Sequence, residues 1–139
     1  AGAGEYRGGS GAVRVYRSMN ENQTFTASFG RNKWPVWGAA GGKDGSVNYF
    51  QFIDADGTVS EPMGIAARRV MNTNDVVRMV TATGGGYGNP FKRPAEKVAM
   101  DVKNEYITVE QAKADYGVLV DPETFKVLGL TEERQKAEK

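Results

Sequence analysis

Alternating apolar and polar residues mark strands in the first part of the chain. Residues 23–29 place two phenylalanines and one alanine at every second position, with Thr or Ser between them. A period of two is typical of a strand that buries one face. Residues 11–19 alternate in a similar way, and the short polar segment 20–22 between these two strands predicts a hairpin.

Two further strands are expected downstream. Residues 47–54 are rich in aromatic side chains and run into the turn Asp54-Ala55-Asp56-Gly57. Gly57 suits the left-handed position of a hairpin turn. Residues 76–83 form the last strong strand pattern, and Asn74, which tolerates a positive φ angle, leads into it.

The pattern changes to helices after residue 93. Pro94 suits the first position of a helix, and residues 95–102 carry apolar side chains at i, i+3, i+4 and i+7. A second helix is expected to begin at Thr108, where Gln111 completes a capping box, and to end at Gly117.

A short strand at 118–120 and a third helix beginning at Thr131 complete the expected elements. The third helix has Glu132 and Glu133 in its first turn, and residues 131–139 are almost wholly polar. We therefore expect this helix to fray or to pack on a partner.

These elements predict an α+β domain. Its β part is a glycine-rich antiparallel sheet, sandwich- or barrel-like, and two or three short C-terminal helices follow. Residues 1–93 hold all but two of the 18 glycines and form the expected antiparallel β region. Residues 94–139 are expected to be a helical C-terminal extension of the same domain.

Composition and charge exclude several function classes. The 139 residues include 18 basic and 17 acidic side chains, a net charge of +1, which argues against nucleic-acid binding. No segment approaches the roughly 20 apolar residues that a membrane span needs. The absence of a signal-peptide pattern and of an initiator Met before Ala1 leads us to expect a cytoplasmic protein and a cloned or processed piece of a longer chain.

Cysteine and histidine are both absent from the sequence. Disulfides, thiolate or imidazole zinc sites, and Ser-His-Asp or Cys-His catalysis are therefore excluded. Any metal would have to be a hard cation with oxygen ligands. We expect no catalytic, cofactor-binding or metal-ligating residue in this chain.

Three glycine- or aspartate-containing segments could carry chemistry, but each has a plainer interpretation. Residues 84–88 could cradle a phosphate, yet they lack the Lys-Ser/Thr of a P-loop, and a tight strand-to-helix crossover is favoured. Asp54 and Asp56 resemble the start of a calcium loop whose other ligands are missing. Residues 8–11 place a serine among glycines without any histidine to activate it.

Two pairs of side chains are better candidates. Trp34 and Trp37 flank Pro35 and suit either ligand stacking at the surface or a core anchor, with the core slightly favoured. Arg68 and Arg69 could bind a carboxylate or phosphate, although a salt-bridged strand face is commoner. The candidate motif or interface residues are Trp34, Trp37, Arg68, Arg69, Gly84, Gly85, Gly86, Tyr87 and Asn89.

Four motifs in a fixed order resemble those of a known family. They are Gly-Glu-Tyr-Arg-Gly-Gly-Ser-Gly at 4–11, the segment from Trp-Gly to Gly-Gly-Lys-Asp-Gly at 37–45, Gly-Gly-Gly-Tyr-Gly-Asn-Pro at 84–90, and Ala-Asp-Tyr-Gly-Val at 114–118. This order resembles the C-terminal region of the hydantoinase B / oxoprolinase / acetone carboxylase alpha subunit family, and the resemblance ends near Val120.

The chain departs from that family's pattern at two positions. The family's glycine run usually has four glycines followed by Tyr-Gly-Asp-Pro, whereas here Thr83 precedes three glycines and Asn89 replaces the aspartate. Asparagine keeps the turn propensity but lacks the charge, which puts an ionic role at that position in doubt. Asn74 stands where the family often has glycine before the last strand.

The resemblance implies the C-terminal domain of a larger, ATP-dependent enzyme subunit, which opens a cyclic amide of the hydantoin or 5-oxoproline type. It also implies a hetero-oligomer with a hydantoinase-A-like ATP-binding subunit, and ATP and a divalent metal in the full complex but no cofactor in this segment. The metal site of the carboxylase relatives involves upstream histidines. This chain's own role would be structural or subunit-docking.

Two alternatives remain open at this point. The chain could belong to an ATP-dependent acetone or acetophenone carboxylase subunit, because the C-terminal region does not separate the two reactions. It could instead be a non-enzymatic β-sandwich binding module, with Trp34, Trp37 and the aromatic strand as its surface.

Overall fold

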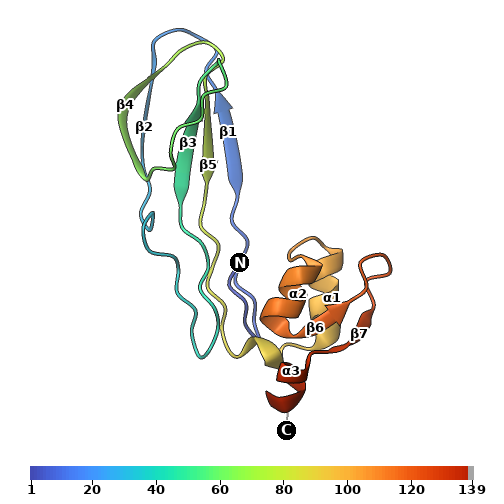
Figure 1. Cartoon of the computed structure of the whole chain (residues 1–139). Helices are drawn as coiled ribbons and strands as arrows, with labels where there is room; N and C mark the ends of the chain where they lie inside the picture. Colours follow the sequence, from blue (N-terminus) through green and yellow to red (C-terminus); the bar gives the residue numbers. More distant parts are fainter. Residues whose placement is uncertain (138–139) are drawn as a thin grey trace. The chain divides into compact units, whose positions relative to one another are not determined.

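A computed structural model describes residues 1–137 and confirms the α+β class, with antiparallel sheets and no closed barrel (Figure 1). The elements follow in the order β1 (Val13–Arg17), β2 (Gln23–Ser28), β3 (Tyr49–Ile53), β4 (Ile65–Met71), β5 (Val76–Val80), η1 (Pro90–Lys92), α1 (Ala95–Lys103), α2 (Val109–Tyr116), β6 (Val118–Val120), β7 (Val127–Leu130) and α3 (Glu132–Ala137). Among residues 1–137, no helix has the length and apolar character needed to cross a bilayer.

The chain divides into two compact units. The β unit comprises Gly11–Val36 and Ser46–Thr83, and the helical unit comprises Ala1–Ser10, Trp37–Gly45 and the chain from Gly84 onward. Each unit is thus built from segments that lie far apart in the sequence. That residues 1–93 and 94–139 fold as one domain stays a prediction.

The β unit contains two antiparallel sheets, and its strand pairing differs from the expected hairpin. β1 pairs with β5, which also pairs with β3, while β2 pairs with β4. The predicted β1–β2 hairpin is wrong because the alternating pattern specifies which face a strand buries but not which strand lies beside it. β4 is not among the expected strands. A bulge interrupts its pairing with β2, and Arg68 there has φ 52°.

The core of the β unit lies between its two sheets and is largely aromatic. The rings of Phe50 and Phe52 are fully buried, and Phe25 of β2 packs edge-on against them with centroid distances of 5.8 and 5.5 Å. Edge-to-face packing of this kind aligns the positive edge of one ring with the negative face of another. The inward face expected for 23–29 is confirmed, because Phe25, Ala27 and Phe29 are half-buried and pack against this core. The similar expectation for 11–19 is wrong, because every residue of β1 is exposed.

Local turn chemistry in the β unit follows the sequence expectations. The turn after β3 closes through a hydrogen bond from the amide of Gly57 to the carbonyl of Asp54, and Gly57 has φ 89°. Asn74 before β5 has φ 74°. Both positions favour residues that tolerate left-handed backbone.

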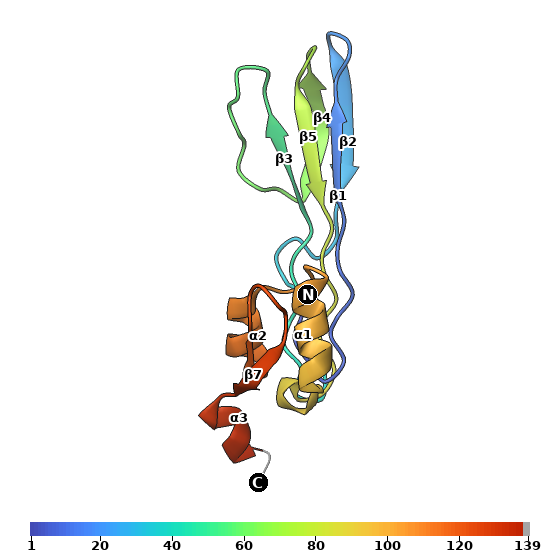
Figure 2. The same cartoon turned by 90° about the vertical axis from the view of Figure 1, so that its right-hand side faces the viewer.

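In the helical unit, α1 packs against α2, β6 and β7 (Figures 1 and 2). The apolar stripe of α1 buries Val98, Ala99 and Val102 as predicted. The capping box of Thr108 and Gln111 is present at α2, and Gly117 ends that helix in the left-handed conformation with φ 63°. α1 begins one residue later than expected, with Pro94 as its N-cap.

α3 is anchored on its own chain, which corrects the expectation that it frays or needs a partner. Arg134 is only 4% exposed. Its guanidinium donates hydrogen bonds to the carbonyl oxygens of Tyr116, at 2.9 Å, and Arg93, at 2.8 Å. A polar helix can dock in this way because a buried guanidinium satisfies several carbonyls at once. Residues 138–139 of the expected helix lie outside the described residues.

Candidate functional site

Three glycine-rich segments lie side by side in the helical unit and form what we call the glycine layer, residues 1–9, 37–44 and 84–88. Their backbones are joined by hydrogen bonds from Gly2 to Gly84, from Gly84 to Gly9, from Gly86 to Lys43 and from Ala39 to Gly86, each with an N···O distance of 2.9 Å. The glycine run at 84–86 is thus bonded to both other segments, which also contact each other through the amide of Lys43 and the carbonyl of Ala3.

Close approach of backbones explains why glycine is needed in this layer. A Cβ atom on Gly86 would overlap the carbonyl oxygen of Ala3, and one on Gly85 would overlap that of Trp37. A Cβ atom on Gly8 would likewise overlap the carbonyl oxygen of Gly84. Of the 84–88 run, only Gly88 has a positive φ, at 76°. The expected crossover with unusual φ/ψ thus accounts for Gly88, whereas Gly84–86 serve close packing instead.

The glycine layer does not fit a phosphate. A phosphate cradle needs several backbone N–H groups directed at the anion. Here the amides of Gly84, Gly86, Tyr87 and Gly88 donate to the carbonyls of Gly9, Lys43, Tyr6 and Ala39. The segment that could have held nucleotide phosphates therefore has four of its five amide donors engaged within the protein.

Tyr87 and Asn89 have separate roles at the end of this run. The Tyr87 side chain is exposed, and its ring centroid lies 6.3 Å from that of Tyr6. The Asn89 side chain caps η1, because its Oδ1 accepts a hydrogen bond of 2.9 Å from the amide of Phe91. A neutral oxygen performs this capping as an aspartate would, which explains how Asn89 can replace the family's Asp.

A nearly buried ionic group, which we call the arginine cluster, joins the glycine layer to the helices. It contains Arg7, Arg93 and Asp101. Asp101 Oδ2 accepts from Arg93 Nε at 3.0 Å and Nη2 at 2.9 Å, and Arg7 Nε lies 3.6 Å from the same oxygen. Arg93 Nη1 also donates to the carbonyl of Glu5 at 3.0 Å. The cluster thereby ties α1 to the N-terminal segment of the layer.

Aromatic residues complete the surroundings of the arginine cluster. The Arg7 guanidinium carbon lies 4.5 Å from the centroid of the Tyr106 ring, within the range of a cation–π contact. The Tyr116 hydroxyl is buried without a hydrogen-bond partner, and so is Arg7 Nε. Burial raises the pKa of Tyr116, against the opposing effect of Arg93, so its phenol stays protonated at neutral pH.

Sequence reasoning misses the arginine cluster. Arg7 and Asp101 are separated by more than ninety positions, and neither belongs to a local motif of charged residues. The usable signal is weak: Asp101 borders the apolar stripe of a predicted helix, where a carboxylate that becomes buried requires a cationic partner.

Both tryptophans are exposed, so the slightly favoured core interpretation is wrong. Trp34, in the β unit, is 76% exposed, and Trp37, in the helical unit, is 71% exposed. Large exposed aromatics suit recognition better than stability.

Arg68 and Arg69 both belong to β4 but lie in different environments. Arg69 forms an ion pair with Asp54, with Nη2 3.1 Å from Oδ1, and its guanidinium lies 5.1 Å from the centroid of the Phe52 ring. This confirms the salt-bridged strand face for Arg69. Arg68 lies in the bulge, where its amide donates to Thr26 Oγ1 at 3.1 Å.

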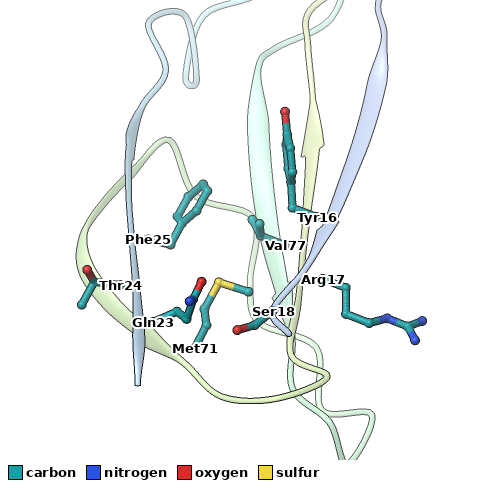
Figure 3. Close-up of a pocket in the computed structure, with 8 residues that line it drawn as sticks. All are labelled: Tyr16, Arg17, Ser18, Gln23, Thr24, Phe25, Met71 and Val77. Atoms are coloured by element: carbon teal, nitrogen blue, oxygen red, sulfur yellow. The ribbon is translucent and has the colours of Figure 1, made fainter. Parts of the chain in front are cut away.

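The β unit has a cavity of about 290 Å³ at one end of its two sheets (Figure 3). Phe25 and Val77 point into it, whereas Arg17 and Thr24 point away (Figure 3). Its lining holds no acid, and residues 1–137 contain no group of three or more Asp or Glu that could hold a metal ion. The described acids therefore offer no cluster of oxygen ligands for the divalent metal that the family resemblance implies.

Comparison with known proteins identifies the class to which this fold belongs. The family model described as Hydantoinase B/oxoprolinase matches residues 1–90, and the chain belongs to that family. The B subunit of a putative D-/L-hydantoinase from Pseudomonas sp. (strain NS671) is 32% identical over 119 residues, which cover 84% of this chain and 20% of the relative.

Caprolactamase and acetone carboxylase are also similar to this chain. The beta subunit of caprolactamase from Pseudomonas jessenii is 30% identical over 136 residues, covering 86% of this chain and 21% of that relative. The crystal structure of ATP-dependent caprolactamase from the same organism matches with a TM-score of 0.75 and 28% identity, over 97% of this chain and 23% of its own. A nucleotide-free acetone carboxylase structure matches with a TM-score of 0.76 and 20% identity. The match covers 98% of this chain and 22% of the carboxylase chain, which shows a shared fold.

The chain spans about a fifth of the length of the curated relatives it matches. It is a hydantoinase-B-type domain, homologous to one part of much longer subunits.

Proposed function

We propose that this chain is the C-terminal domain of a hydantoinase-B-type subunit in an ATP-dependent cyclic amide hydrolase, with a structural and subunit-docking role of its own. The single observation that carries this role is the glycine layer, in which four of the five amides of residues 84–88 are engaged in backbone pairing. The names of the relatives, a hydantoinase subunit and an ATP-dependent caprolactamase, support the reaction class.

ATP and a divalent metal would bind in other parts of the complex, because the described residues hold no cluster of acids for a metal and the paired amides of the glycine run are not directed at a phosphate. The partner would be a hydantoinase-A-like ATP-binding subunit in a cytoplasmic hetero-oligomer. Two relatives are named as the B or beta subunits of their enzymes, which supports a multi-subunit assembly. The carboxylase alternative rests on a likeness of fold at 20% identity and receives no specific support from the site.

The test compares the isolated chain with the full complex, each supplied with ATP, Mg²⁺ and either hydantoin or 5-oxoproline. We expect ring opening coupled to ATP hydrolysis by the complex and none by the chain alone. Turnover by the chain alone would contradict the supporting role. Bicarbonate-dependent ATP hydrolysis with acetone, in place of amide hydrolysis, would favour the carboxylase.

A further inference from the structure

The cavity at one end of the β unit lies between the two sheets and has one wall from each (Figure 3). The first wall comes from β2 and β4. Gln23 and Phe25 are two residues apart on β2 and therefore share a face, and Gln23 lies directly opposite Met71 of β4. The phenyl ring and the thioether make this wall apolar, and the Gln23 amide lies at its end.

The second wall comes from β1 and β5. Tyr16 lies directly opposite Val77 in the pairing of these strands, and Ser18 follows Tyr16 two residues later. Val77 is fully buried, and Ser18 is 6% exposed. A serine at an inward position fills little space, whereas buried phenylalanines fill the space between the sheets further along the strands. This difference in side-chain size explains why the β unit is hollow at this end.

The cavity suits a small molecule without charge. Arg17 is the charged residue of its lining, and the Arg17 side chain points away from the cavity (Figure 3). A charged ligand would therefore lose its hydration without gaining an ionic partner. The volume of about 290 Å³ lies near the lower limit of ligand pockets, which is about 300 Å³.

Two polar groups face into the cavity and retain hydrogen-bonding capacity. Ser18 Oγ donates to the carbonyl of Asn20 at 2.8 Å, which leaves its oxygen able to accept. The Gln23 side chain reaches from β2 toward Met71 and Ser18, and its amide forms no hydrogen bond within residues 1–137 (Figure 3). A primary amide presents a carbonyl oxygen and an N–H side by side, whichever way it is turned.

We infer that this cavity binds a neutral cyclic amide, with the ring against Phe25 and Val77 and the amide edge on Gln23. In a small ring the amide bond is held cis, so that its N–H and its carbonyl oxygen lie on one edge. That edge matches the carbonyl oxygen and the N–H of the Gln23 amide in two parallel hydrogen bonds. An open-chain amide is trans and cannot present both groups to one partner.

The site is one for binding and not for ring opening. Its lining contains no acid, and its one basic side chain is directed away. The inference rests on the proposed function only in that cyclic amides are then the molecules that this protein meets. It adds a second place for them, within the β unit, apart from the reaction that the proposed function assigns to the full complex.

The first test is nuclear magnetic resonance of the full chain with ¹³C-labelled methionine methyl groups, titrated with caprolactam. We expect a saturable shift of the Met71 methyl signal, with a Kd on the order of 1 mM, and none at Met100, an exposed residue of α1. N-methylcaprolactam, which lacks the N–H, and 6-aminohexanoate, the charged open-chain form, should bind at least tenfold more weakly. No saturable shift at Met71, equal shifts at both methionines, or equal affinity for N-methylcaprolactam would overturn the inference.

The second test removes the amide that reads the ligand. We expect Gln23→Leu, which keeps the length of the side chain, to weaken caprolactam binding about tenfold, because both hydrogen bonds are lost. Thr24→Val changes the neighbouring residue, which points away from the cavity, and should leave the affinity unchanged. Thermal unfolding checks that each variant folds, and unchanged affinity in Gln23→Leu would overturn the inference. Binding is measured without ATP or a partner subunit, so failure of this site and failure of the proposed reaction are distinguished.

Discussion

Arg93 and Asp101 form an ion pair in which two nitrogens of one guanidinium, Nε and Nη2, contact a single carboxylate oxygen at 3.0 and 2.9 Å. Both side chains are nearly buried, at 13% and 9% exposure. The pair also fixes the N-terminal segment, because Arg93 reaches the carbonyl of Glu5. This contact is the clearest link between the glycine layer and the helices within the helical unit.

Because the Asp101 carboxylate holds this contact together, its removal should destabilise the folded chain. We expect Asp101→Ala to lower the free energy of unfolding by about 3 kcal/mol or more, because it leaves Arg93 and Arg7 without their shared anion in a nearly dry site. Urea denaturation followed by far-ultraviolet circular dichroism measures the change. Lys136→Ala, which breaks an exposed pair with Glu132, is the control and should change stability by less than about 0.5 kcal/mol. Equal effects of the two variants would contradict the prediction.

The Tyr116 hydroxyl is a buried polar group whose removal should stabilise the folded chain. We expect Tyr116→Phe to raise the free energy of unfolding by about 1 kcal/mol at neutral pH, because the hydroxyl is buried without a hydrogen bond. Replacement by phenylalanine keeps the ring and its packing. A loss of stability in the same urea titration would show that the hydroxyl has a partner.

The raised pKa of Tyr116 also predicts that the folded chain loses stability at alkaline pH. Its pKa is raised in the folded protein by burial. Above a pH of about 10, the unfolded chain therefore releases the phenolic proton while the folded chain still holds it, and the free energy of unfolding falls as pH rises. Below that pH both states are protonated and the contribution is constant. The fall should be smaller in Tyr116→Phe, as measured by thermal unfolding across the alkaline range.

Gly8 and Gly9, adjacent in the glycine layer, differ in the space that is available for a methyl group. A Cβ on Gly8 would overlap the backbone of Gly84, whereas one on Gly9 would have open space. We expect Gly8→Ala to destabilise the chain by about 3 kcal/mol or more and Gly9→Ala by no more than about 0.5 kcal/mol. Comparable melting temperatures for the two variants would show that the segments can separate without cost.

The Asn89 cap can be tested against the family's aspartate. Asn89→Asp keeps an oxygen that accepts from the amide of Phe91, so its stability should stay within about 0.5 kcal/mol of the parent chain. Asn89→Ala removes the acceptor and should cost about 1 kcal/mol. Thermal unfolding of the three proteins, compared at one pH, measures both differences. A large gain with aspartate would show that charge, and not only capping, matters there.

Because both tryptophans are exposed, a soluble quencher should strongly reduce their fluorescence. In the single-tryptophan variants Trp34→Phe and Trp37→Phe, the remaining indole should be quenched by acrylamide nearly as well as free tryptophan. Addition of the partner subunit then shows which indole becomes protected. Weak quenching in the isolated chain would contradict the exposure of both rings.

Several features of this fold can be predicted because they depend on neighbours in the sequence. The capping box of Thr108, the left-handed glycines Gly57 and Gly117, and the buried face of β2 each follow from a few adjacent side chains. Such signals act within one turn or one strand and need no knowledge of distant residues. The four family motifs likewise indicate the correct class through residue type and order alone.

Other features cannot be predicted in this way because they depend on which distant segments meet. The strand order β1-β5-β3, the burial of Asp101 beside Arg7 and the exposure of both tryptophans follow from long-range contacts, and alternation or composition does not encode the partner. The glycine run is recognisable as a motif, but the sequence pattern points to backbone dihedral angles and not to close packing as its purpose.

The sequence by itself determined the local elements, the absence of thiol and imidazole chemistry, and the family resemblance, since each depends on residue type and spacing alone. Only the tertiary structure decided that Gly84–86 permit three backbones to pack without side chains between them. It also buried the Asp101 carboxylate beside two arginines. These outcomes depend on distances between residues far apart in the chain, which no local pattern contains.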